Sequence, residues 1–129
     1  MTSKACSATV RSGRLDKARQ FLDAADMIDA LVESDADLVD AFVTLCVHAG
    51  IAAADVISCV RLGVHFQGPD HAGAIALLDR IDTKLGRDLS VLLGLKTKSG
   101  YGAVVSSTAN RKAAGRAARR LVAEARSIG

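Results

Sequence analysis

The chain has 129 residues, of which half are apolar but only 3% aromatic, with a single proline and a formal net charge of +3. This length suits one domain with one core, and the composition favours closely packed helices over a β-sandwich. Polar residues at positions 2–4 leave no apolar segment of the kind found in signal peptides, so we expect a cytoplasmic protein.

The first predicted element is an amphipathic helix over residues 15–32. Apolar side chains recur there at three- and four-residue spacing, and aspartates fill much of the other face. We expect residues 1–12 to be frayed and residues 13–129 to form a single helical-bundle domain.

The second element is an almost wholly apolar helix, capped by Ser34 or Asp35 and ending near Leu62. Its length would allow it to cross a bilayer, but Asp55 and His48 would be costly in lipid and its flanks lack aromatic residues. We therefore expect a buried helix of a soluble bundle and no contact with a membrane. His48 and Asp55 lie two turns apart and could share a polar pocket, but a lone buried histidine bonded to a neighbour is the favoured interpretation.

Three further helices complete the predicted fold. Gly63 is expected to stop the second helix, and Gly86 the third. The predicted ranges are 70–84 for the third helix, about 87 to 100 for the fourth, and 109–127 for the last, which Ser106, Ser107 or Thr108 would cap. Because short connections make successive helices antiparallel, the sequence predicts an all-α, up-and-down bundle of about five helices.

The three cysteines are odd in number and show neither a disulfide framework nor zinc-binding spacing. Buried thiols are therefore expected at Cys6, Cys46 and Cys59. Phosphate-binding loops, nucleophile elbows and zinc-protease motifs are also missing from the sequence, which sets those enzyme classes aside. We expect no cofactor and no metal.

Charge is divided unevenly along the chain. Residues 1–86 contain eight basic and twelve acidic residues, whereas residues 87–129 contain nine basic and two acidic ones. Such a basic last helix could follow RNA phosphates or meet an acidic partner, or it could be a solvated face neutralised by the acidic first half. The candidate binding residues are Arg111, Lys112, Arg116, Arg119 and Arg120.

Two polar clusters are candidates for chemistry. The first contains Arg61, His65, Gln67, Asp70 and His71, and it combines a cation with two histidines that titrate near physiological pH. The second contains Lys96, Lys98 and Tyr101, near the end of the fourth predicted helix. Helix capping and interaction with helix dipoles explain both clusters without any function.

Four segments together are similar to a known family. They are AFVTLCVHAGIAAADVISCVRLG at 41–63, GPDHAGAIALL at 68–78, LLGLKTKSGYG at 92–102 and RKAAGRAARRLVAEA at 111–125. In this order they resemble the HEPN superfamily, small helical bundles of prokaryotic defence and toxin–antitoxin systems. The resemblance covers roughly residues 14–126 and implies an HEPN-like bundle.

Active HEPN ribonucleases carry an arginine and a histidine separated by four to six residues, at a dimer interface. Here Arg61 and His65 are separated by three residues and Arg61 and His71 by nine, and the last helix has no histidine. The resemblance therefore implies a non-catalytic protein that binds a partner, as the antitoxin or accessory subunit of a nucleotidyltransferase-type toxin. The alternatives are a metal-independent ribonuclease using Arg61, His65 and His71, or an RNA-binding module. A homodimer is left open.

Overall fold

Five helices and two short strands form the described part of the chain, residues 3–67 and 71–129 of a computed structural model. The helices are α1 (Ala8–Leu31), α2 (Val39–Leu62), α3 (Ala72–Ile81), α4 (Thr83–Tyr101) and α5 (Thr108–Ile128). The strands are β1 (Ser3–Ala5) and β2 (Val64–Phe66), which pair antiparallel. The predicted all-α bundle of about five helices is confirmed.

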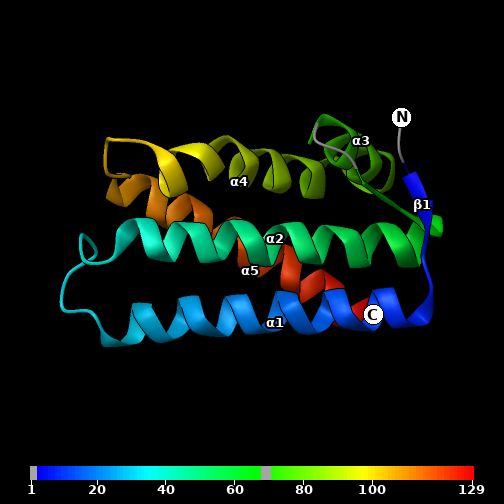
Figure 1. Cartoon of the computed structure of the whole chain (residues 1–129), viewed down its shortest axis with the longest axis horizontal. Helices are drawn as coiled ribbons and strands as arrows, with labels where there is room; N and C mark the ends of the chain where they lie inside the picture. Colours follow the sequence, from blue (N-terminus) through cyan, green and yellow to red (C-terminus); the bar gives the residue numbers. More distant parts are fainter. Residues whose placement is uncertain (1–2, 68–70) are drawn as a thin grey trace.

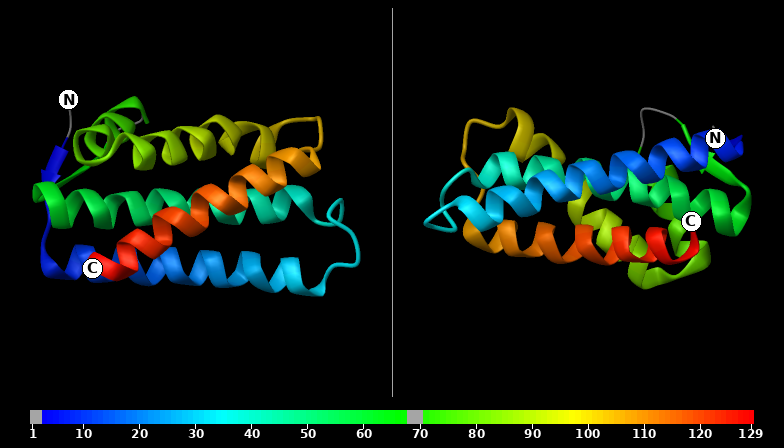
Figure 2. Two further views of the ribbon diagram at one scale, coloured as in Figure 1. Left: turned by 180° about the vertical axis from the view of Figure 1, so that it is seen from behind. Right: turned by 90° about the horizontal axis from the view of Figure 1, so that it is seen from below.

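The four long helices run alternately up and down (Figure 1). α2 lies between α1 and α4, and α5 crosses the back of α2 obliquely, from the side of α4 toward the start of α1 (Figure 2). The segments 32–38 and 102–107 both lie at the left of Figure 1, which we call the loop end. The two strands and α3 lie at the opposite end, which we call the ribbon end.

α2 forms the centre of the bundle, as its apolar sequence predicts. Fifteen of its 24 residues are buried, and it contacts α1, α3, α4 and α5. Within the described residues it is the one helix long and apolar enough to cross a membrane, but neighbouring helices cover most of it, as in a soluble bundle. At Gly50 an added methyl group would overlap Leu92 of α4, so the missing side chain allows these two helices to approach closely.

Several helix ends agree with the sequence signals. Ser107 caps α5 by accepting a hydrogen bond from Asn110 N at 3.1 Å. Gly63 ends α2 with a φ of +75°, a left-handed conformation that glycine adopts without steric cost.

The cap predicted for α2 and the stop predicted for α3 differ from the structure. α2 begins at Val39 rather than at Ser34 or Asp35, and the residue before it, Leu38, has a φ of +54° and makes no side-chain cap. Gly86 lies inside α4 instead of ending α3, because Asp82 stops α3 and caps α4 by accepting from Lys84 N at 2.8 Å.

Residues 3–12 carry regular secondary structure for most of their length, within the segment 1–12 for which the sequence predicts fraying. Residues 3–5 form β1, and α1 begins at Ala8, where Ser7 accepts a hydrogen bond from Val10 N. Pairing with β2 supplies the backbone partners of β1, and a contact with residues so distant in sequence leaves no local signal. Residues 1 and 2 lie outside the described part.

The prediction of three free thiols is wrong for two of the cysteines. Cys6 and Cys59 form a disulfide that ties the start of α1 to the last turn of α2, across a sequence separation of 53 residues. Cys46 remains a free, buried thiol, and burial raises its pKa to about 12. An odd count in sequence did not reveal that two of the three meet in the fold.

Candidate functional site

Two adjoining cavities open near the ribbon end. The inner cavity has a volume of about 230 Å³ and lies among α1, α2, β2, α3 and α4. The outer cavity has a volume of about 380 Å³ and lies between the first turns of α1 and β2. Four residues border both: Arg14, Asp55, Phe66 and Gln67.

An ion pair between Arg14 and Asp55 stands where the two cavities meet. Arg14 Nε donates to Asp55 Oδ2 at 2.8 Å, and Arg14 Nη2 donates to the same oxygen. Burial raises the pKa of Asp55, and the hydrogen bond and positive charge of Arg14 oppose this effect. The carboxylate of Asp55 is therefore largely buried but borders both cavities, and the side chain of Arg14 is partly exposed.

His65 is buried on β2 beside this pair, with 5% of its surface exposed. Its backbone lies opposite Lys4 of β1, and its ring borders the outer cavity. Within the described residues its Nδ1 is buried and has no hydrogen-bond partner.

His71 borders the inner cavity from the other side. Its Nε2 lies 3.0 Å from Lys96 Nζ, which brings together one residue from each predicted polar cluster. The donor and acceptor roles in this contact depend on the tautomer of the imidazole ring. Lys96 thus positions the imidazole at the cavity wall.

Arg61 lies apart from both histidines. It borders neither cavity, its side chain is half exposed, and it forms an ion pair with Glu124 of α5 at 3.7 Å. The structure therefore brings His65, Gln67 and His71 to the cavities but not Arg61. Asp70 lies outside the described residues.

Arg14 is the site residue that sequence reasoning missed. It occurs in a segment with many charged residues, and its partner is 41 positions away. The one available signal was Asp55 itself, because an acid in the centre of an apolar helix requires a cationic partner.

The pocket considered for His48 and Asp55 does not form. His48 is exposed, its ring lies 5.4 Å from that of Phe21, and it borders a separate small cavity that also includes Lys96 and Tyr101. Seven helical residues separate the two side chains by about 10 Å along the axis of α2, so they share a face but meet different positions of α1, His48 beside Phe21 and Asp55 beside Arg14. Lys98 is exposed in the last turn of α4.

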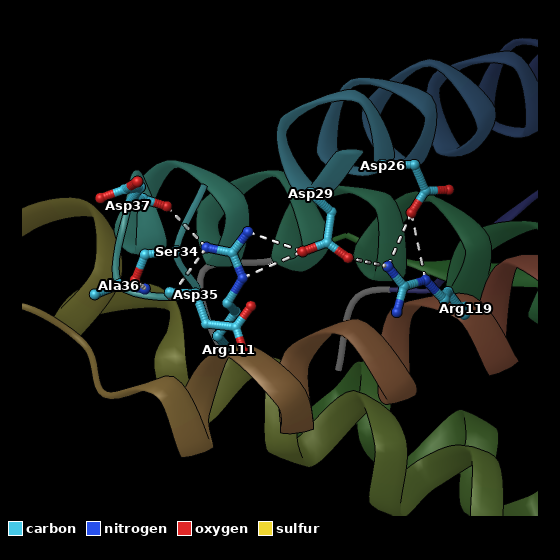
Figure 3. A network of polar contacts seen from close by, with 8 residues as sticks. All are labelled: Asp26, Asp29, Ser34, Asp35, Ala36, Asp37, Arg111 and Arg119. Carbon is cyan, nitrogen blue, oxygen red and sulfur yellow. Dashed lines mark hydrogen bonds and ion pairs between the residues drawn. The ribbon is translucent and has the colours of Figure 1, made fainter. Parts of the chain in front are cut away.

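Arginines of α5 interact with acids of α1 (Figure 3). Arg111 is 3% exposed, donates to Asp29 Oδ1 at 2.9 Å through Nη2, and donates to the backbone oxygens of Asp35 and Asp37. Arg119 donates to Asp26 Oδ1 at 3.0 Å and to Asp29 Oδ2 at 3.4 Å. Two of the five candidate binding residues thus connect α5 to α1 and the following segment.

Arg120 pairs with a third acid. Its Nε and Nη2 donate to the two oxygens of the buried carboxylate of Asp88 in α4, at 2.9 and 2.6 Å. The hydrogen bond to Asp88 raises the pKa of Arg120. Lys112 and Arg116 are exposed on α5 and have no ion pair within the described residues. Of the five candidate binding residues, Lys112 and Arg116 are thus the two whose positive charge is not paired with an acid in the described part of the chain.

Large apolar side chains are exposed at the loop end. Tyr101 is 85% exposed, and the others come from the last turns of α1 and from the two connecting segments: Met27, Leu31, Leu38, Val104 and Val105. The two segments are adjacent, because Ser106 N donates to Asp40 Oδ1 in the first turn of α2 at 3.1 Å. Elsewhere in the described residues, the one large apolar side chain that is exposed is Val91, and only 37% of its surface is accessible.

Within residues 3–67 and 71–129, no three histidines, cysteines or acids group together in a way that could hold an ion. No model of a known protein family matches the chain, and a search of curated proteins finds no significant match.

Proposed function

We propose that this chain is a non-catalytic, HEPN-like binding protein that attaches through its loop end to a protein partner. The proposed partner is a nucleotidyltransferase-type toxin, and the chain would neutralise it as an antitoxin or accessory subunit. The observation that carries the proposal is the exposure of six large apolar side chains at one end of the bundle. Exposed apolar groups of this kind mark surfaces that bind other proteins.

The charges support protein binding over RNA binding. A protein that follows RNA phosphates needs cations free to contact them. Arg111, Arg119 and Arg120 already neutralise acids of this same chain, and α5 presents no aromatic side chain for stacking on bases. The partner surface is therefore assigned to the loop end rather than to α5.

Co-expression with the product of the neighbouring gene tests this proposal. We expect the two chains to purify together and the partner's toxicity to disappear. Val104→Asp should abolish both effects, whereas Val91→Asp, the same change at an exposed position in the middle of α4, should preserve them. A chain that purifies alone and does not rescue growth would contradict the proposal, as would equal effects of the two substitutions.

The cytoplasmic location is part of the same proposal, because toxins of this type and their antitoxins act inside the cell. The Cys6–Cys59 disulfide tests it, since the cytoplasm keeps most thiols reduced. Rapid alkylation during lysis followed by mass spectrometry measures the state of both cysteines. Reduced cysteines agree with the proposed location, and a complete disulfide argues for an oxidising compartment.

One observation favours the ribonuclease alternative. His65 and His71 border adjoining cavities that share Arg14, so an arginine other than Arg61 stands between them. Incubation of the purified chain with total RNA decides the matter. Cleavage that disappears in both His65→Ala and His71→Ala would replace the binding role with an enzymatic one.

A further inference from the structure

The adjoining cavities at the ribbon end share the Arg14–Asp55 pair and differ in the side chains that complete their walls. Beyond the shared pair, Gln67 and His71, the inner cavity is bordered by apolar side chains: Ile51, Ala54, Phe66, Ala74, Leu89 and Leu93. The outer cavity is bordered by Thr9, Lys17 and His65 in addition to the Arg14–Asp55 pair. One molecule that occupies both would have an apolar body and a polar head.

The side chains where the two cavities meet indicate the charge of the ligand's polar head. Arg14 and Lys17 contribute two positive charges, and Asp55 contributes one negative charge. Asp55 engages Nε and Nη2 of Arg14, whereas Nη1 has no hydrogen-bond partner within the described residues. A singly charged anion would neutralise the remaining positive charge, and a planar carboxylate suits the donors of a guanidinium group.

His65 is a polar residue with an unsatisfied nitrogen that lies next to the outer cavity. A buried imidazole nitrogen without a partner is unfavourable by about 1–3 kcal/mol, so such groups are rare in folded proteins. The ring is fixed in place by the pairing of β2 with β1 and by its burial. Its strand thus holds a polar ring at the wall of the cavity where the head of a ligand would lie.

The volume of the inner cavity limits the size of the ligand's apolar part. A volume of about 230 Å³ accommodates roughly eight non-hydrogen atoms, at the ~30 Å³ that one water molecule occupies in the liquid. A six-membered ring or a branched aliphatic chain of similar size fits this volume. A long acyl chain exceeds it.

We propose that the ribbon end binds a small organic monocarboxylate, with its carboxylate held by Arg14 and Lys17 and its apolar body in the inner cavity. The site lies at the opposite end of the bundle from the proposed partner surface, and its occupancy does not depend on that proposal. The two proposals can therefore fail separately.

Titration calorimetry of the full chain with benzoate tests the site, with benzamide as a neutral molecule of the same shape. We expect saturable binding of benzoate and at least tenfold weaker binding of benzamide. Ala74→Leu should abolish benzoate binding by filling the inner cavity. Ala76→Leu, the same change at an exposed position two residues further along α3, should leave binding unchanged.

Lys17→Gln provides a variant that does not disturb packing, because Lys17 is exposed. We expect it to weaken benzoate binding roughly 2- to 5-fold, the range for an exposed charge interaction. The proposal is overturned if benzoate does not bind, if benzamide binds equally well, or if both leucine variants bind benzoate like the unaltered chain.

Discussion

The guanidinium carbon of Arg111 lies 4.5 Å from the centroid of the Phe42 ring, which places a buried cation of α5 against an aromatic face of α2. The same guanidinium donates to Asp29 and to two backbone oxygens, so one side chain joins three segments. Charged hydrogen bonds of this kind are directional and stronger than neutral ones. This contact is where a single substitution should most weaken the packing of the loop end.

Arg111→Met should lower the free energy of unfolding by about 3 kcal/mol, because it removes the cation–π contact and leaves the carboxylate of Asp29 and two backbone oxygens without their donor. Arg111→Lys keeps the charge but loses the planar fork, so it should have an intermediate effect. Urea unfolding followed by circular dichroism measures both. Lys112→Met, at the adjacent exposed position, should change stability by no more than about 0.5 kcal/mol. Equal losses at positions 111 and 112 would contradict the internal role of Arg111.

Gly50→Ala should destabilise the protein by about 1–3 kcal/mol, because the added methyl group would overlap the buried side chain of Leu92. Gly94→Ala is the matched control on α4, where no atom lies within 4 Å of the added methyl group. Alanine is the better helix former, so this change should stabilise by roughly 0.5–1 kcal/mol. Thermal unfolding of both variants measures the difference, and shifts of the same sign would count against the close approach of α2 and α4.

Reduction of Cys6–Cys59 should lower the free energy of unfolding by about 4 kcal/mol, because the bond closes a long loop in the unfolded chain. Denaturant unfolding with and without a thiol reductant measures this loss. Cys6→Ser should reproduce it and should make the protein insensitive to the reductant.

Cys46 supplies an independent check on the cysteine assignment. Its pKa of about 12 and its burial leave almost no accessible thiolate at pH 8. The native, oxidised protein should therefore take up no maleimide, and denaturation without reduction should expose one reactive thiol. Mass spectrometry that finds three reactive thiols would show that the disulfide is not present.

Asp55→Asn should change how stability depends on pH. Burial raises the pKa of Asp55 in the folded protein above the ordinary value of 3.8, so the folded state holds this proton more tightly than the unfolded state. The contribution of Asp55 to stability therefore falls as the pH rises from 3.8 to the folded pKa, and is constant above it. Asparagine has no proton to lose.

The stability of Asp55→Asn minus that of the unaltered chain should therefore increase with pH across that window. Urea unfolding at closely spaced pH values above 4 measures the difference. A difference that stays constant, or that falls with pH, would mean that the hydrogen bond from Arg14 outweighs burial at this carboxylate.

Sequence reasoning succeeded where structure follows from local periodicity and failed where it depends on distant partners. The apolar character of residues 39–62 was sufficient to place α2 at the centre, since no other position in a bundle covers a helix on all sides. The register of β1 with β2, the Cys6–Cys59 bond and the Arg14–Asp55 pair each join residues tens of positions apart. Nothing in the local pattern encodes these partners.

The candidate site shows the same limit. The composition of the sequence revealed that the last helix is basic. Whether an arginine of that helix can bind another molecule depends on which acids of the same chain lie beside it in the fold. Arg119 and Arg116 are both exposed arginines in that helix, yet Arg119 meets Asp26 and Asp29 whereas Arg116 meets no acid within the described residues. This difference depends on which part of α5 lies against α1, and the composition of α5 does not encode it.

The first and the last described elements both end away from the loop end. β1 stands at the ribbon end (Figure 1), and Gly129 at the end of α5 lies near Val56 and Leu15, in the half of the bundle that contains the strands. α2 separates the two ends by about 36 Å, the length of 24 helical residues. An affinity tag or fluorescent protein joined to either terminus would therefore leave the loop end unobstructed, so capture experiments can use either fusion to search for a partner.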